Sequence, residues 1–126
     1  MKQTYKSTAK FLIENENYLV AIHDKADGDC FGSAIALCTL LKKLDKQAKV
    51  LSSSPIPERL EFINVAGIEC IIGADAFRKV YSDDCTIIST DVASDQLLSE
   101  LENELAGKIK FAIDHHKTNS ITCENL

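Results

Sequence analysis

Histidine and aspartate residues gather in three short stretches of this 126-residue sequence, and each stretch directly follows an apolar run. The residues are His23, Asp27, Asp29, Asp91, Asp114, His115 and His116. Carboxylates and imidazoles without thiolates suit Mn²⁺ or Mg²⁺ better than a structural zinc ion. Such a cluster can hold two ions roughly 3.5–4 Å apart, which clamp the attacking and leaving oxygens of a displacement at phosphorus. The residue types therefore predict metal-dependent hydrolysis of phosphate esters.

The elements that must position these residues alternate between strands and helices. Apolar runs predict strands at 18–22, 48–51, 69–72, 85–90 and 109–113. Helical spacing and turn signals predict helices at 5–15, 30–44, 57–65, 75–81 and 95–105. This alternation is typical of βαβ units. We therefore predict one α/β domain, with a mostly parallel sheet of about five strands and helices on both faces.

The three stretches follow the strands predicted at 18–22, 85–90 and 109–113. Ligands bind at the carboxyl ends of the strands in an open parallel sheet, so the stretches are expected to meet at one edge. Each stretch alone has a plainer interpretation. Residues 23–29 could be a polar loop that caps a helix through Asp29, Asp91 could cap a helix, and adjacent histidines could be surface residues. The shared edge favours a metal site over these alternatives.

The first stretch carries further expectations about the backbone. Gly28, between Asp27 and Asp29, is expected to let the loop turn sharply. Gly32 and Ser33 are expected to open the following helix. The amide groups of that helix, together with Ser33, would then help to hold a phosphate oxygen of the substrate.

Composition narrows the choice of partners. The formal net charge is −5 and no basic stripe is present, which argues against binding to long duplex nucleic acid. The nearest approach to a stripe is interpreted as the solvated end of a helix; it consists of Lys42, Lys43, Lys46 and Lys49. The five cysteines include no C-x-x-C pair and are expected to be free thiols. No signal peptide or membrane span is recognised, so we expect a soluble, cytoplasmic protein.

The motifs resemble those of the DHH phosphoesterases, and in motif order the resemblance covers nearly the whole chain. The stretch from His23 to Ser33, HDKADGDCFGS, resembles the first motif. Thr90-Asp91-Val-Ala resembles the second, and DHHKTN, ending at Asn119, resembles the third. The D-G-D-x-x-G-S form is most similar to the nanoRNase (oligoribonuclease) and pAp-phosphatase branch, or to RecJ exonucleases.

The resemblance implies a centre with two Mn²⁺ ions, for which Mg²⁺ could substitute. It implies that His23 and Asp27 bind one ion, that Asp29 and His115 bind the other, and that Asp91 bridges the two.

The remaining motif residues would act around this centre. His116 would contact the scissile phosphate, Asp114 would orient a neighbouring histidine, and Asn119 would brace the loop. Arg59 is interpreted as a helix-surface arginine rather than a substrate contact.

The family normally has a further metal-binding aspartate and a small substrate-binding domain beyond the third motif. Residues 1–126 are therefore expected to be a DHH catalytic domain that is incomplete at its carboxyl end, and to hydrolyse substrate slowly or not at all. Expected substrates are short oligoribonucleotides, pAp, or cyclic and linear dinucleotides. The alternatives are an inorganic pyrophosphatase, a non-catalytic domain that binds a metal or nucleotide, and a purely structural domain. Expected partners are the small phosphorylated substrate, a second copy of the chain or the missing domain, but no membrane.

Overall fold

The computed structural model describes residues 5–90, 92 and 95–113. Its core is a five-stranded parallel sheet in the order β3-β2-β1-β4-β5. The strands are β1 (Asn17–Ala21), β2 (Gln47–Ser52), β3 (Cys70–Ile72), β4 (Cys85–Thr90) and β5 (Ile109–Ile113). The helices are α1 (Tyr5–Glu14), α2 (Gly28–Lys43), α3 (Ala74–Val80) and α4 (Leu101–Glu104), with 3₁₀ turns η1 (Glu58–Ile63) and η2 (Asp95–Leu98). The predicted α/β fold is confirmed.

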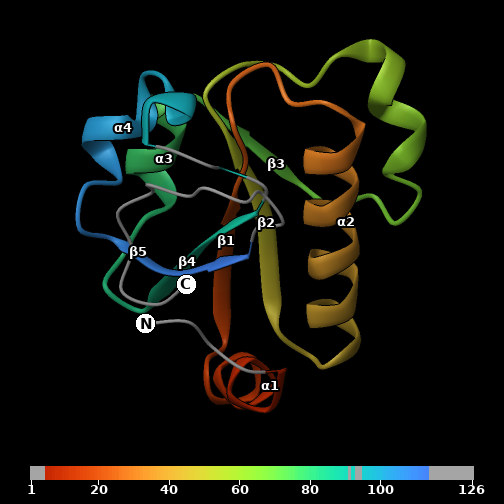
Figure 1. The fold of residues 1–126 in the computed structure, drawn as a ribbon, viewed down its shortest axis with the longest axis vertical. Coiled ribbons are helices and arrows are strands. Elements are labelled where there is room, and N and C mark those ends of the chain that lie inside the picture. The colour runs from red at the N-terminus through yellow and green to blue at the C-terminus, as the bar shows by residue number, and fades with distance from the viewer. Residues whose placement is uncertain (1–4, 91, 93–94, 114–126) are drawn as a thin grey trace.

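Helices cover both faces of the sheet because successive strand side chains point to opposite sides. In β1, Tyr18 and Val20 belong to the core that α2 closes, whereas Leu19 and Ala21 belong to the core beneath α3 and α4. Figure 1 shows α2 on one face and the two shorter helices on the other. All six residues of β4 are buried, as expected of a central parallel strand.

Two predicted helices take a different form. The segment predicted at 57–65 is the 3₁₀ turn η1, and the one predicted at 95–105 divides into η2 and α4. The break falls at Ser99, whose backbone is left-handed with φ of 54°. Of the apolar stripe predicted at Leu97, Leu98, Leu101 and Leu105, the last three are buried and Leu97 is 40% exposed. Apolar periodicity therefore located the buried face without revealing the interruption.

The strand order decides which loops meet. β1 lies between β2 and β4, and β4 lies between β1 and β5. The chain therefore leaves β1 toward β2 on one side and returns to β4 on the other, which makes the β1–β4 boundary a topological switch point. The three strands that precede the His/Asp stretches are thus neighbours, and the carboxyl ends of β1 and β2 point toward the top of Figure 1.

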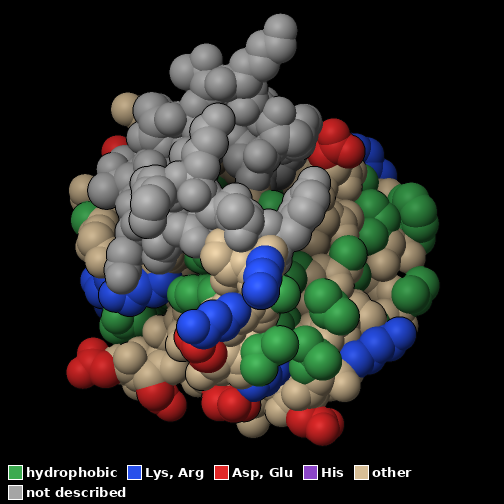
Figure 2. Space-filling view, turned by 60° about the horizontal axis from the view of Figure 1, so that its bottom comes forward, with side chains coloured by type: hydrophobic (Ala, Val, Ile, Leu, Met, Phe, Trp, Pro, Cys, Tyr) green, Lys and Arg blue, Asp and Glu red, His purple; other side chains and the backbone are tan. Residues whose placement is uncertain are grey.

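The opposite end of the molecule carries α1 and most of the lysines. Figure 2, which looks at this end, shows basic and acidic side chains interspersed. Lys46 is not the solvated residue that was expected, because its side chain is only 9% exposed. Its ammonium lies 2.8 Å from both the Ile13 carbonyl and a Glu16 carboxylate oxygen, and so ties the end of α1 to the turn before β2. No helix of the described chain is both long and apolar enough to cross a membrane.

Candidate metal site at the carboxyl edge of the sheet

His23 is presented by the loop that leaves β1, and its protonation pattern follows from its hydrogen bond. Nδ1 lies 2.9 Å from the backbone carbonyl of Asp24. A carbonyl oxygen can only accept, so Nδ1 must carry the hydrogen of this bond. The neutral imidazole then keeps its lone pair on Nε2. This arrangement, in which one ring nitrogen donates to the protein and the other is left for a metal, is typical of metal-binding histidines.

Asp27 lies opposite His23 and also begins helix α2. Its Oδ1 accepts the Cys30 amide hydrogen at 2.9 Å, with an extended backbone at Asp27, so it is the N-cap residue. The same oxygen lies 3.9 Å from His23 Nε2. Two atoms that each bind one ion at about 2.1 Å can be at most about 4.2 Å apart. The separation is too long for a hydrogen bond but fits a pair of ligands that share an ion.

Two expectations and one alternative interpretation of this loop require correction. The helix cap is Asp27 rather than Asp29, and Asp29 lies exposed in the first turn of α2. Gly28 is the first helical residue and has no left-handed backbone, so it does not make the sharp turn. Ser33 lies a turn further into the helix, where backbone amides bond within the helix. The expected opening of the helix at Gly32 and Ser33 is therefore wrong, because the N-cap hydrogen bond starts the helix five residues before Ser33.

The loop between β1 and α2 is instead braced from both sides. The Asp24 amide donates to the Leu97 carbonyl at 2.6 Å, and the Ser53 hydroxyl donates to Asp24 Oδ1 at 3.1 Å. Hydrogen bonding by the Ser54 side chain, then by Ser53, lowers the pKa of Asp24 against the opposing effect of burial. Asp24 therefore serves as an anchor for the histidine next to it. Ser53 and Ser54 belong to the loop after β2, which becomes adjacent to this loop only in the folded sheet.

The sharp turn of this loop is made by Lys25. Its φ is 53°, in the left-handed region that costs a residue with a Cβ roughly 1–2 kcal/mol. Its amide donates to Ser54 Oγ at 3.2 Å, and its side chain is exposed. The surrounding hydrogen bonds therefore impose a backbone conformation that the residue itself does not favour.

The end of β4 closes the other side of the site. The Cys30 thiol, in the first turn of α2, donates to the Thr90 carbonyl at 3.3 Å. The hydroxyls of Ser89 and Thr90 are buried and have no hydrogen-bond partner among the described residues. Buried polar groups are normally satisfied by protein, water or an ion. At the β4 end of the switch point, bound water, an ion or a ligand would therefore satisfy the hydrogen-bonding capacity of these two hydroxyls.

The donor set fits a divalent ion, although only part of the predicted set is described. The structure brings His23 and Asp27 together and leaves Asp29 exposed beside them. In the described ranges no group of three or more His, Cys, Asp or Glu side chains could hold a metal ion. The other predicted site residues lie outside these ranges; they are Asp91, Asp114, His115, His116 and Asn119. Their roles remain predictions.

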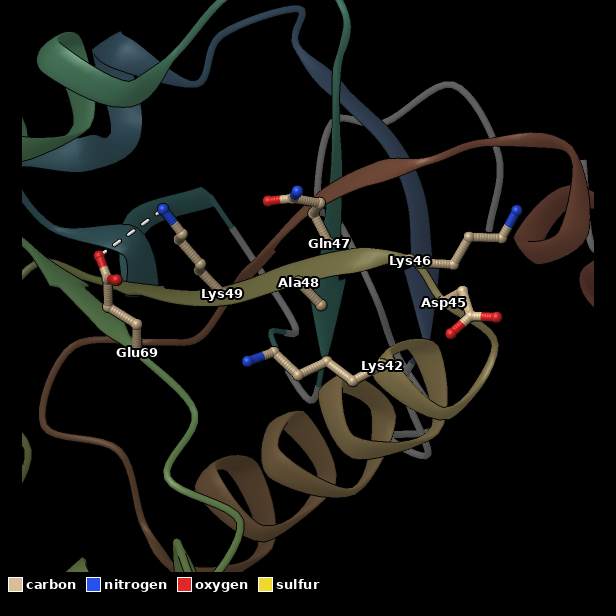
Figure 3. Close-up of a pocket in the computed structure, with 7 residues that line it drawn as sticks. All are labelled: Lys42, Asp45, Lys46, Gln47, Ala48, Lys49 and Glu69. Atoms are coloured by element: carbon tan, nitrogen blue, oxygen red, sulfur yellow. Dashed lines mark ion pairs between the residues drawn. The ribbon is translucent and has the colours of Figure 1, made fainter.

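A polar cavity at the other end of the sheet is a poorer candidate. It has a volume of about 440 Å³ and is lined by Lys42, Asp45, Lys46, Gln47, Ala48, Lys49 and Glu69. Figure 3 shows Lys49 paired with Glu69, at 3.7 Å, and Lys46 turned away. The cavity lies at the carboxyl end of α2, where the helix dipole is negative. Lysines there stabilise the helix end, so they do not indicate an anion site.

An apolar groove of about 460 Å³ lies between α2, η1 and β3. It is lined by Phe31, Pro55, Ile56, Glu61, Asn64, Ile68, Cys70 and Ile72. β3 is two strands from β1, a distance of roughly 10 Å. The groove carries a carboxylate and no cation, so it suits an uncharged, flat group better than a phosphate.

The strand order is that of a doubly wound α/β fold, a class in which ligands generally bind at the switch point. The N-terminal domain of the DHH family matches residues 17–126, and the chain therefore belongs to the DHH family. No curated protein matches the sequence. In structure the chain is similar to an exopolyphosphatase-related protein from Bacteroides fragilis, with a TM-score of 0.73 and 19% sequence identity. The match covers 94% of this chain and 37% of that protein's length.

Proposed function

We propose that the chain is the metal-binding domain of a metal-dependent phosphoesterase. The observation that carries this proposal is the pairing of His23 Nε2 with the Asp27 carboxylate, 3.9 Å apart at the switch point of a DHH domain. The tautomer of His23 supports it, because Nδ1 donates to the Asp24 carbonyl and leaves Nε2 for a metal. A structural helix cap alone would not require the histidine to be oriented in this way.

The proposed centre holds two divalent ions, Mn²⁺ in preference and Mg²⁺ as a substitute. His23 and Asp27 would hold one ion, Asp29 and His115 the other, and Asp91 would bridge them. Bound ions would neutralise negative charge on the phosphoryl oxygens and favour deprotonation of water near neutral pH.

The protein's own groups would orient the substrate. In the proposal, His116 contacts the scissile phosphate and Asp114 orients a neighbouring histidine. The described loop holds the imidazole of His23 through its hydrogen bond to the Asp24 carbonyl, and Ser53 in turn holds the Asp24 carboxylate.

The proposed substrates are small phosphorylated nucleotides: short oligoribonucleotides, pAp, or cyclic and linear dinucleotides. The apolar groove beside β3 supports a substrate that carries a base. A second candidate is an inorganic chain of phosphates, as pyrophosphate or polyphosphate, which is favoured by the exopolyphosphatase-related protein of similar fold. The chain spans 37% of the length of that protein.

Hydrolysis assays with Mn²⁺ and with EDTA test the proposal. They measure release of phosphate from pAp, pyrophosphate and polyphosphate, and release of mononucleotide from pApA. We expect hydrolysis by residues 1–126 to be slow or absent; where it occurs, we expect it to require the metal and to be abolished by His23→Gln. Calorimetry with Mn²⁺ measures binding separately from turnover. Unchanged Mn²⁺ affinity in both His23→Gln and His115→Ala would contradict the proposed centre and favour a structural domain.

A further inference from the structure

The edge of the sheet formed by β3 is open within the described chain. β3 is the outermost strand, and among the described strands it pairs with β2 alone. The Glu69 carbonyl and the Gly73 amide both bond to β2, at 3.0 and 2.8 Å. Successive residues of a strand direct their backbone groups to opposite sides, so Cys70 and Ile72 direct theirs away from β2. These two residues therefore present backbone donors and acceptors that an added strand would pair.

β3 lacks most of the features that protect an edge strand. Proteins prevent edge strands from pairing with other chains by means of charges, proline, bulges or a short strand. β3 contains no charged residue or proline, and its register with β2 is regular. Only its length of three residues is protective. A short edge limits the length of an added strand but does not prevent its pairing.

The open edge adjoins the apolar groove between α2, η1 and β3. The side chains of Cys70 and Ile72 line this groove, so the residues with outward-facing backbone groups also form part of its wall. Phe62 and Val65, each directly after a lining residue in the sequence, are 75% and 92% exposed. The turn η1, light green in Figure 1, lies beside α2. An apolar side chain of an added strand would therefore enter the groove from the edge.

The charge beside the groove is negative. Glu61 lines the groove and Glu58 lies one turn earlier in η1, and both are exposed. No lysine or arginine of the described ranges is within ion-pair distance of either carboxylate. Lys49, on the strand next to β3, pairs with Glu69 at 3.7 Å instead. Charge complementarity therefore favours a partner that carries lysine or arginine.

We propose that the β3 edge and its groove bind an extended peptide segment of another protein, which adds to the sheet as a sixth strand. Backbone hydrogen bonds would supply affinity, and the groove would supply specificity. The segment would carry apolar and basic residues at alternate positions, so that both kinds of side chain face the groove. A flat base in the groove would leave the backbone groups of β3 unpaired, whereas an extended chain uses both features. The proposal does not involve the metal site and goes beyond the phosphoesterase function.

A synthetic peptide tests the proposal. The probe has valine, lysine and valine at alternate positions, threonine between them and blocked termini. It is titrated into the isotope-labelled chain in EDTA, and binding is followed by NMR. We expect the amide resonances of Cys70 and Ile72 to shift as the peptide is added, because these amides would enter new hydrogen bonds.

Methylation of peptide nitrogens separates backbone pairing from side-chain contact. A strand directs every second amide toward its neighbour. Methylation of the set that faces β3 should weaken binding by at least about tenfold, since its hydrogen bonds to the edge are lost. Methylation of the other set should change the affinity by less than about twofold. Equal effects of the two methylated peptides would overturn the proposal.

Charge variants test the basic residue of the segment. Glu61→Gln should weaken binding of the probe by about two- to fivefold, and should strengthen binding of a peptide with glutamate in place of its lysine. Glu102→Gln is the matched control, because Glu102 is an exposed carboxylate of α4 on the other face of the sheet. It should leave both affinities unchanged. Equal effects of Glu61→Gln and Glu102→Gln would refute the charge complementarity and overturn the proposed partner.

Three further results would overturn the proposal. The first is the absence of shifts at Cys70 and Ile72. The second is a dimer of the chain in sedimentation velocity that Ile72→Pro dissociates, since proline removes only an outward-facing amide and the edge would then belong to a second copy. The third is displacement of the peptide by adenosine, which would assign the groove to a substrate base. Peptide binding with the expected pattern would support the proposal even if the chain hydrolyses no phosphate ester.

Discussion

Asp27 caps helix α2 and is a proposed metal ligand, and substitution can separate the two. Its Oδ1 caps helix α2 by accepting the Cys30 amide at 2.9 Å, and the same carboxylate faces His23 Nε2 at 3.9 Å. Asparagine caps a helix about as well as aspartate, whereas alanine costs about 1 kcal/mol. Without metal, Asp27→Ala should therefore be about 1 kcal/mol less stable than Asp27→Asn. Both variants should bind Mn²⁺ at least about tenfold more weakly, because each lacks the carboxylate.

Urea denaturation in EDTA, followed by circular dichroism, measures the first difference. Asp27→Asn should itself lose a few tenths of a kcal/mol against wild type, about the effect of an exposed charge on the helix dipole. A difference of about 1 kcal/mol between the two variants corresponds to roughly 3–6 °C in Tm for a domain of this size. Calorimetry then measures the Mn²⁺ affinity of the two variants and of wild type on the same samples.

A matched control lies at the other end of α2. Asp45 follows the helix, is exposed, and has a left-handed backbone that asparagine tolerates. Asp45→Asn should raise stability by at most a few tenths of a kcal/mol, because it removes a negative charge beside the negative end of the helix, and it should leave Mn²⁺ affinity unchanged. Equal stability of Asp27→Ala and Asp27→Asn would show that the Asp27 side chain does not stabilise the start of α2. Wild-type Mn²⁺ affinity in Asp27→Asn would show that the Asp27 carboxylate is not a metal ligand.

Three other predictions follow from buried or strained groups. Burial, and secondarily the neighbouring Cys70, raises the pKa of the Cys38 thiol to about 12, so DTNB at pH 8 should modify Cys38 only after unfolding. Burial raises the pKa of Tyr18 to about 12, and its hydroxyl donates to the Leu12 carbonyl at 2.7 Å. The pKa of Tyr18 in the folded state lies above its unfolded value of 10.0, so the stabilisation is complete below pH 10 and is lost as the pH rises toward 12. Over that pH range, the denaturation midpoint should therefore fall more steeply in wild type than in Tyr18→Phe. Ser99→Gly should raise the free energy of unfolding by up to about 1 kcal/mol, and a lower midpoint in urea would show that the left-handed backbone is not strained.

Much of the fold could be predicted from local pattern. The run Cys85–Thr90 matched β4 at both ends, because β-branched residues between turn residues leave few alternatives. The stripe of Phe31, Ala34, Ile35, Cys38 and Leu41 is the buried face of α2. The alternation of such elements was enough to predict a parallel sheet, since parallel strands need helical crossovers between them.

The details of the site were decided by contacts between segments far apart in the sequence. Asp24 meets Ser53 and Leu97 only because β2 and η2 flank the loop after β1 in the folded sheet. The same contacts impose the left-handed turn at Lys25, where the local sequence had pointed to Gly28 instead. Local propensity is too weak to predict such a reversal, because tertiary hydrogen bonds outweigh it.

The sequence by itself determined which residue types reach the carboxyl edge, because the side chains that follow each strand are a matter of order along the chain. Only the tertiary structure decided that β1 lies between β2 and β4, that Asp27 rather than Asp29 begins α2, and that His23 presents Nε2 toward Asp27. These features depend on strand order and hydrogen-bond geometry, which arise when separate segments pack together and leave no periodic trace in the sequence.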